Sequence, residues 1–155
     1  AYPCYGWAAC SVDVSVDLDT YEVSIDRCVH AVDVGKAINP VIVKGQIEGG
    51  TLQSLGWALW EDVLYRDGRV VNDRMTNCIV PTFADAPEMT TIIVEEPFAN
   101  GPHGAKGVGE IPMDGPCAAV VGAVEDALAG LASSTGFDTL PCSPEAIAAA
   151  MRSVS

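Results

Sequence analysis

The chain has 155 residues, enough for one domain with a packed core, and 49% of them are hydrophobic. Its 21 acidic and 8 basic residues give a formal net charge of −13, which disfavours phosphate backbones and anionic lipid as partners. No segment is long and apolar enough for a membrane span. The first ten residues, AYPCYGWAAC, lack both Met and the basic and apolar regions of a signal peptide, so we expect a subunit or a fragment of a longer polypeptide.

Apolar and polar residues alternate from about residue 10 to residue 34. The apolar positions of the first part are Val12, Val14, Val16 and Leu18. The same period resumes at Val23 and Ile25, after the turn-forming segment DLDT. This pattern predicts a β-hairpin with one buried face, followed by a third strand segment near residues 29–34.

The period then changes to that of a helix. Asn39 is a favourable N-cap residue and Pro40 a favourable first helical residue, so we expect a helix from there to about Asp62. RDG at residues 66–68 predicts a turn, and short strands are expected around residues 70–71 and 91–95.

The C-terminal part predicts two more helices. Small residues dominate DGPCAAVVGAVEDALAGL, which we expect to be a helix capped by Asp114 and ended near Gly130. A short last helix is expected to begin at Ser143-Pro144, after a linker over residues 132–141. Together these elements predict a single α+β unit, a small mixed sheet packed with two main helices.

The six cysteines are even in number, which would suit disulfides, but their surroundings favour free thiols. No pair has the C-x-x-C spacing of a zinc or iron–sulfur site. Cys78 and Cys117 lie in apolar segments and are expected to be buried. We therefore predict reduced thiols in a cytoplasmic protein and no metal ligand in this chain.

The segment KGQIEGGTLQSLG carries several glycines within the predicted first helix. Gly45, Gly49 and Gly56 fall along one stripe, and Gln46 and Gln53 share a neighbouring one. Glycine costs about 1 kcal/mol per interior helix position relative to alanine, so something must offset it. Either another helix packs closely there, or a flat polar ligand lies across the glycines with a glutamine amide at its edge.

A second glycine-rich segment, HGAKGVGEIP, stops at a single glutamate. Gly104, Gly107 and Gly109 can adopt positive φ and bring bare backbone close to a ligand. The spacing matches neither the dinucleotide fingerprint nor the P-loop. If Glu110 is desolvated at the end of this loop, it can serve as a general base. The alternative is a solvated turn residue, or a cap of the following helix.

The remaining chemistry-bearing residues carry weaker signals. His30 and His103 have no acidic or cysteine partner at ligand spacing, so both are expected to be structural or solvent-facing. Nothing in the sequence supports a role for Asp33, Glu48 or Glu61, and no G-x-S-x-G nucleophile motif is present.

The two glycine-rich motifs, in this order and followed by AAVVGAVEDAL, resemble the C-terminal part of the large subunit in the xanthine oxidase family of molybdenum hydroxylases. The resemblance covers roughly residues 5–132. It implies that residues 1–155 form the second molybdopterin-binding domain of such a subunit, with residues 133–155 as a C-terminal extension. Members of the family hydroxylate an electron-poor carbon of an N-heterocycle or aldehyde with oxygen from water.

Site residues follow from the resemblance position by position. Glu110 matches the catalytic glutamate, the general base of the family. Gln46 matches a glutamine that hydrogen-bonds the pterin, and Gln53 matches a common glutamine without a firm role. The segment that lies along the pterin corresponds to Lys106, Gly107, Val108 and Gly109.

The resemblance also implies cofactors and partners. The cofactor would be a molybdenum-pterin, either molybdopterin or its cytosine dinucleotide form. [2Fe–2S] clusters and FAD are expected on partner domains or chains, and the remainder of the molybdopterin-binding subunit must complete the site. Two competing hypotheses are a non-catalytic assembly module and a small acidic binding domain unrelated to molybdenum.

Overall fold

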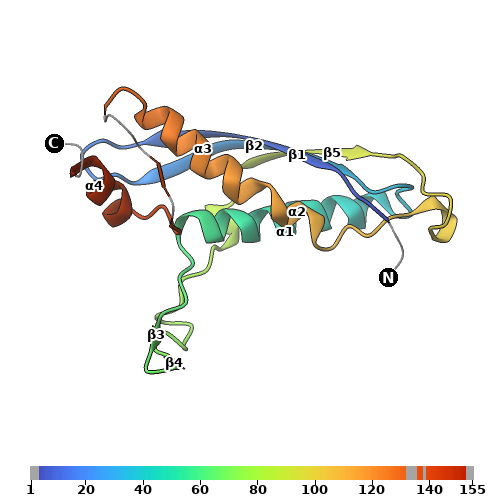
Figure 1. The fold of residues 1–155 in the computed structure, drawn as a ribbon. Coiled ribbons are helices and arrows are strands. Elements are labelled where there is room, and N and C mark those ends of the chain that lie inside the picture. The colour runs from blue at the N-terminus through green and yellow to red at the C-terminus, as the bar shows by residue number, and fades with distance from the viewer. Residues whose placement is uncertain (1–3, 132–135, 138, 153–155) are drawn as a thin grey trace.

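The computed structural model describes residues 4–131, 136–137 and 139–152. Its main sheet has three strands in the order β1–β2–β5 (Figure 1). β1 (Ala8–Val16) and β2 (Val23–Asp33) form the predicted antiparallel hairpin, and β5 (Glu88–Val94) pairs with β2 in parallel. Leu18 does not share the half-buried face of β1 but lies in the turn, where it is 55% exposed.

The prediction of a separate third strand segment at residues 29–34 is wrong, because β2 runs through it without a break. A β-bulge shifts the register between Asp13 and Val14. It leaves Asp26 and Arg27 both exposed, so the buried positions move from odd to even residue numbers. The change of phase in the sequence therefore marks a bulge inside one strand and not a turn between two.

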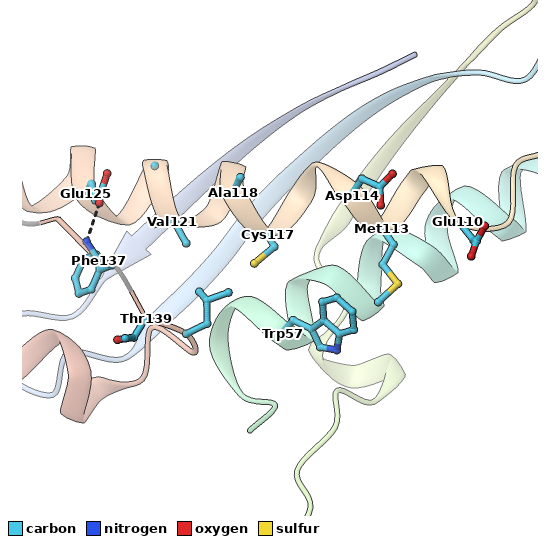
Figure 2. A pocket seen from close by; sticks show the side chains of 12 residues that line it. Trp57, Glu110, Met113, Asp114, Cys117, Ala118, Val121, Glu125, Phe137 and Thr139 are labelled. Carbon is cyan, nitrogen blue, oxygen red and sulfur yellow. Dashed lines mark hydrogen bonds between the residues drawn. The ribbon is translucent and has the colours of Figure 1, made fainter. Parts of the chain in front are cut away.

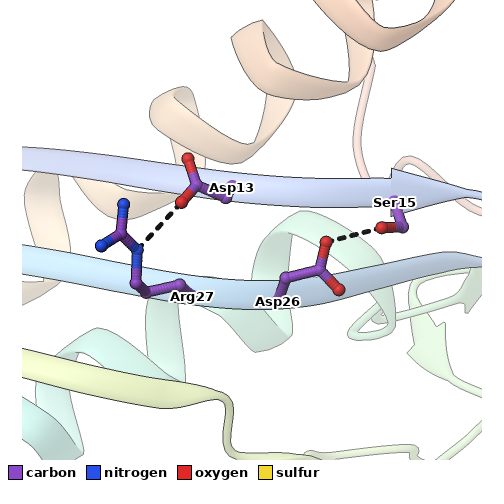
Figure 3. A network of polar contacts seen from close by, with 4 residues as sticks. All are labelled: Asp13, Ser15, Asp26 and Arg27. Carbon is purple, nitrogen blue, oxygen red and sulfur yellow. Dashed lines mark hydrogen bonds and ion pairs between the residues drawn. The ribbon is translucent and has the colours of Figure 1, made fainter.

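The bulge also creates a polar patch on the outer face of the sheet, opposite the helices (Figure 3). The Ser15 hydroxyl lies 2.5 Å from Asp26 Oδ2, and Arg27 Nε donates to Asp13 Oδ2 at 3.0 Å. Both contacts are exposed, and they connect β1 to β2 side by side.

Helix α1 (Pro40–Leu59) packs against β2 and β5. As predicted, Asn39 is its N-cap, and the Oδ1 atom of that residue accepts a hydrogen bond from Ile42 N at 3.2 Å. The helix ends at Leu59, before the predicted Asp62, because Trp60 leaves helical geometry with φ −133°, although its N–H still donates to the carbonyl of Gly56.

An arm follows α1 and projects away from the sheet (Figure 1). It carries β3 (Tyr65–Arg66) and β4 (Arg69–Val70), which form a hairpin. The predicted RDG turn is confirmed, since Asp67 and Gly68 adopt the positive φ values of 50° and 74° that such a turn needs. A 3₁₀ turn, η1 (Phe83–Asp85), leads from the arm back to β5.

Three helices complete the described chain: α2 (Ile111–Asp114), α3 (Pro116–Leu128) and α4 (Pro144–Arg152). The prediction that Asp114 caps the long helix is wrong. Asp114 is the last residue of α2, Gly115 is the N-cap of α3, and no side chain caps that helix. α3 does end near Gly130, which adopts φ +88°, and α4 begins at the predicted position.

The core comprises two clusters between the sheet and the helices. The larger consists of Val23, Leu55, Ala58, Leu59, Val120, Val124, Leu128, Cys142 and Ile147. The smaller consists of Val32, Val34, Ala37, Val43 and Ile47. Since Cys142 and Ile147 belong to the larger cluster, this part of the predicted C-terminal extension packs on the same core. The predicted linker includes residues 132–135 and 138, which lie outside the described residues.

The cysteines are free thiols in the structure, as predicted. Cys28 and Cys142 are buried, whereas Cys78 and Cys117, which we expected in the interior, are only partly covered. Among the described residues, no helix has the length and apolar character that crossing a membrane requires.

Candidate functional site

The loop that carries the second glycine-rich motif is fastened to the end of β2. It starts with a 3₁₀ turn, η2 (Pro102–Gly104), and forms an isolated β-bridge between Ala105 and Gly35. Lys36 N donates to the carbonyl of Gly104 at 2.8 Å, and Lys106 N donates to that of Val34 at 2.9 Å. These backbone bonds hold the loop immediately before its last glycines.

Gly35 makes this close approach possible. It adopts φ +65°, and a Cβ atom added there would overlap the carbonyl oxygen of Gly104. Within the loop itself, His103 and Gly104 take positive φ, at 54° and 82°. Of the three glycines that could adopt positive φ, Gly104 does so, whereas Gly107 and Gly109 do not lie in the left-handed region.

A buried ion pair reinforces the same attachment. Lys106 Nζ lies 2.5 Å from Asp33 Oδ2, and the two side chains are only 9% and 6% exposed. Burial alone would raise the pKa of Asp33, but hydrogen bonds from Lys106 and from the Gly35 N–H outweigh it and hold the pKa below its usual range. Sequence reasoning found no role for Asp33, although a polar residue at the end of an apolar strand and before Val-Gly was a usable signal.

The structure brings the two glycine-rich motifs together. The Gln46 Oε1 atom lies 3.9 Å from the position that a Cβ atom on Gly109 would occupy. Gln46 is exposed on α1, and Gln53 is exposed farther along the same helix. The amide of Gln46 therefore borders the backbone that leads directly to Glu110.

Some glycines of α1 allow close packing and others leave an open surface, which were the two alternatives predicted from the sequence. Gly56 serves close packing, because a Cβ atom there would lie 2.8 Å from Pro81 Cδ, and Gly50 lies against Pro112 in the same way at 3.0 Å. Gly45 and Gly49 instead face open space: beyond the helix's own backbone, no atom of the described residues lies within 4 Å of an added Cβ. The exposed stretch of α1 beside Gln46 is thus a bare backbone surface.

Glu110 occupies the N-cap position of α2 but makes no side-chain cap hydrogen bond. Its side chain is exposed, so the described residues of this chain do not provide the desolvation on which the general-base interpretation depends. It borders two grooves. One, of about 790 Å³, runs between α1 and α3 past Trp57, Met113 and Cys117 (Figure 2). The other, of about 440 Å³, is lined by Gly107 and Gly109 as well as Glu110.

Between Lys106 and Glu110, positions that face the core alternate with positions that face the groove. Val108 packs against the smaller core cluster, and Ile111 does the same immediately after Glu110. Gly107 and Gly109 are exposed, and apart from its chain neighbours no atom in the described part of the chain lies within 4 Å of an added Cβ on Gly107. In this segment the backbone at Gly107 and Gly109 and the Glu110 carboxylate are therefore open to a ligand in the smaller groove.

The two histidines contribute nothing to this site. His30 is buried, and its Nδ1 lies 2.8 Å from the Thr51 hydroxyl, which itself donates to the carbonyl of Ile47. Burial lowers the pKa of His30, so the ring is neutral and structural. His103 is exposed, as predicted. No group of three or more metal-ligating side chains occurs in the described part of the chain.

Comparison with known proteins gives matches of one kind. A family model described as a molybdopterin cofactor-binding domain matches residues 1–87. A probable xanthine dehydrogenase subunit of Bacillus subtilis is 36% identical over 124 residues, which are 80% of this chain and 17% of that protein. The crystal structure of quinoline 2-oxidoreductase from Pseudomonas putida 86 is 38% identical with a TM-score of 0.85, over 92% of this chain and 18% of that one.

The carbon monoxide dehydrogenase of Oligotropha carboxidovorans has the same fold, with a TM-score of 0.86 at 28% identity over 97% of this chain and 18% of that one. Fold and family model together define a molybdopterin cofactor-binding domain. The chain belongs to the xanthine oxidase family of molybdenum hydroxylases, so the hypothesis of an unrelated acidic binding domain is wrong. It spans less than a fifth of the length of the curated relatives it matches.

Proposed function

We propose that this chain contributes the general base and part of the pterin-binding surface of a molybdenum hydroxylase. The remaining parts of the site, including the residues that orient the substrate, would come from other segments or subunits. [2Fe–2S] clusters and FAD would lie on those partners. The substrate class is an N-heterocycle or an aldehyde, in keeping with relatives named for xanthine, nicotine, quinoline and aldehydes.

The residues present fit a flat polar cofactor. Gly45, Gly49 and Gly107 leave open backbone where any side chain would fill the space. The amide of Gln46 offers both a donor and an acceptor at the edge of that surface. Gln46 and the backbone of residues 107–109 would therefore hold the pterin, whereas the ammonium of Lys106 is already paired with Asp33.

One observation carries the proposal: Glu110 is an exposed carboxylate that makes no side-chain cap bond, placed directly after the glycine that borders Gln46. When bound, the molybdenum cofactor supplies the redox chemistry of hydroxylation. Glu110 takes up the proton that hydroxylation by water releases, at one of its carboxylate oxygens. Other parts of the enzyme would cover the groove and exclude bulk water from this carboxylate.

The test is Glu110→Gln in the assembled enzyme, assayed with xanthine, quinoline and benzaldehyde and a dye as electron acceptor. Molybdenum and pterin contents should stay at wild-type levels, while turnover per molybdenum falls by a factor of roughly 10² to 10⁴. Glu88→Gln, at the exposed start of β5, is the control and should leave turnover unchanged. Wild-type turnover in Glu110→Gln would remove the proposed base.

The exposure of Glu110 also favours a second candidate, a non-catalytic assembly module that retains the fold. Under that hypothesis both Glu110→Gln and Gln46→Ala are silent. If the proposal holds, Gln46→Ala instead lowers the pterin content of the purified enzyme, because a cofactor hydrogen bond has been removed.

A further inference from the structure

We infer that Asp33 is a positioning residue, which fixes the general base by holding the loop that presents it. This inference rests on the function proposed for Glu110. Asp33 lies at the end of β2 and does not itself line the grooves that Glu110 borders, and it acts through Lys106, which lines the smaller of them.

Both oxygens of the Asp33 carboxylate accept hydrogen bonds, one from the end of β2 and one from the loop that is attached to it. Oδ1 accepts from the Gly35 N–H at 2.9 Å, and Oδ2 accepts from Lys106 Nζ at 2.5 Å. Gly35 is the bridge partner of Ala105. A single buried carboxylate thus links the end of β2 to the loop on the opposite side of the bridge, 73 residues farther along the chain.

The contacts that follow Lys106 carry this constraint to Glu110. Val108 and Ile111 pack into the smaller core cluster on either side of it. Pro112 lies against Gly50 of α1, 3.0 Å from the position of an added Cβ. Among the described residues the Lys106 ion pair is the last polar side-chain contact before the base, and together with the packing of Val108 it limits the freedom of a segment rich in glycine.

The ion pair is also better suited to setting geometry than to adding stability. Burying two charges costs desolvation, so a neutral pair of similar shape is often no less stable than a buried salt bridge. The double variant Asp33→Asn/Lys106→Met is therefore expected to fold while losing the charge-assisted bond. Lys36→Met is the matched control, because Lys36 also pairs with a carboxylate beside this loop, that of Glu95 at 2.8 Å, but at an exposed site.

The experiment measures two quantities in the assembled enzyme. Hydrogen exchange, followed by mass spectrometry of peptides covering residues 103–110, should be about tenfold faster in the double variant. Turnover per molybdenum should fall by about a hundredfold at unchanged KM, since small misplacements of a catalytic group cost that much. Lys36→Met should change neither quantity. Wild-type exchange and turnover in the double variant would overturn the inference.

Combination with Glu110→Gln separates this inference from the function on which it rests. In the Glu110→Gln background the double variant should cause no further loss of turnover, because both changes remove the same contribution. An additional hundredfold loss would show that the ion pair acts elsewhere, and would overturn the inference. If Glu110→Gln itself retains full turnover, the proposed function fails, while the exchange rates still report whether the pair holds the loop.

Discussion

Lys106 and Glu110 lie four residues apart in one loop, yet the fold places them in opposite environments. Lys106 is buried and paired with Asp33, whereas Glu110 is exposed and makes no side-chain cap bond. Lys106 attaches the loop to the sheet, whereas the Glu110 carboxylate lies exposed at the edge of the two grooves. The difference fits the proposed function, in which this chain positions the carboxylate and other parts of the enzyme would cover it.

Helix α1 shows the same division. Its inner positions, such as Ile47 and Leu55, are completely buried, while Val41 is 82% exposed. Two adjacent glycines differ in the same way, since Gly50 contacts Pro112 and Gly49 faces open space. The face of α1 that packs on the sheet and on α2 is thus closely packed, whereas its opposite face is exposed.

The largest effect is expected where the loop approaches β2 most closely. Gly35→Ala combines a positive φ with a Cβ atom that would overlap a backbone oxygen, so the bridge to Ala105 must open. We expect a loss of about 3 kcal/mol in the free energy of unfolding. Urea denaturation of the purified protein measures it.

Gly68→Ala is the control for that change. Gly68 also has a positive φ, at 74°, but open space surrounds it. The Gly68→Ala substitution should lower the free energy of unfolding by only about 1 kcal/mol, the cost of the left-handed conformation alone. Equal losses in the two variants would mean that the close approach at Gly35 contributes nothing to stability.

A smaller effect is expected from pH. The folded-state pKa of Asp33 is depressed, so its stabilisation is present above the ordinary aspartate pKa of about 3.9 and is lost as the pH falls through the folded-state value. Wild-type protein should therefore lose roughly 1 to 3 kcal/mol more than Asp33→Asn on acidification below pH 4. Denaturation curves recorded from pH 6 to pH 2 measure the difference.

The surface pair formed by Arg27 and Asp13 provides the comparison for that experiment. Its two side chains are more than half exposed, so Arg27→Met should change stability by less than about 1 kcal/mol at any pH. Added salt should reduce even this contribution, whereas the buried pair should respond little.

If Asp33→Asn shows the acid dependence of the wild type, the carboxylate does not hold the loop as described.

Local signals in the sequence predicted much of this fold. Asn39 and Pro40 predicted the start of α1, and the alternation before the DLDT turn predicted β1, because those features depend on neighbouring residues alone. The bulge at Asp26 was missed because its phase shift resembles a turn. The separation of α2 from α3 was missed as well, since Asp114 looked like a good cap.

The candidate site was predictable only in part. The two glycine-rich motifs identified Gln46 and the backbone before Glu110, and the structure places them side by side. The pairing of Asp33 with Lys106 depends on a contact between distant segments, which periodicity does not reveal. In the proposed enzyme the surroundings of Glu110 would come from segments outside this chain, which its own sequence cannot predict.

The smallest effect tests the open side of α1. Gly49→Ala adds a methyl group where no atom lies within 4 Å and replaces glycine inside a helix, so it should stabilise the chain by about 1 kcal/mol. Gly50→Ala must displace Pro112 by a few tenths of an ångström, so its gain should be smaller or negative. In the assembled enzyme, Gly49→Ala should nevertheless lower the pterin content, because the methyl group occupies the surface proposed for the cofactor. Full pterin content together with the gain in stability would mean that this surface of α1 is open for another reason.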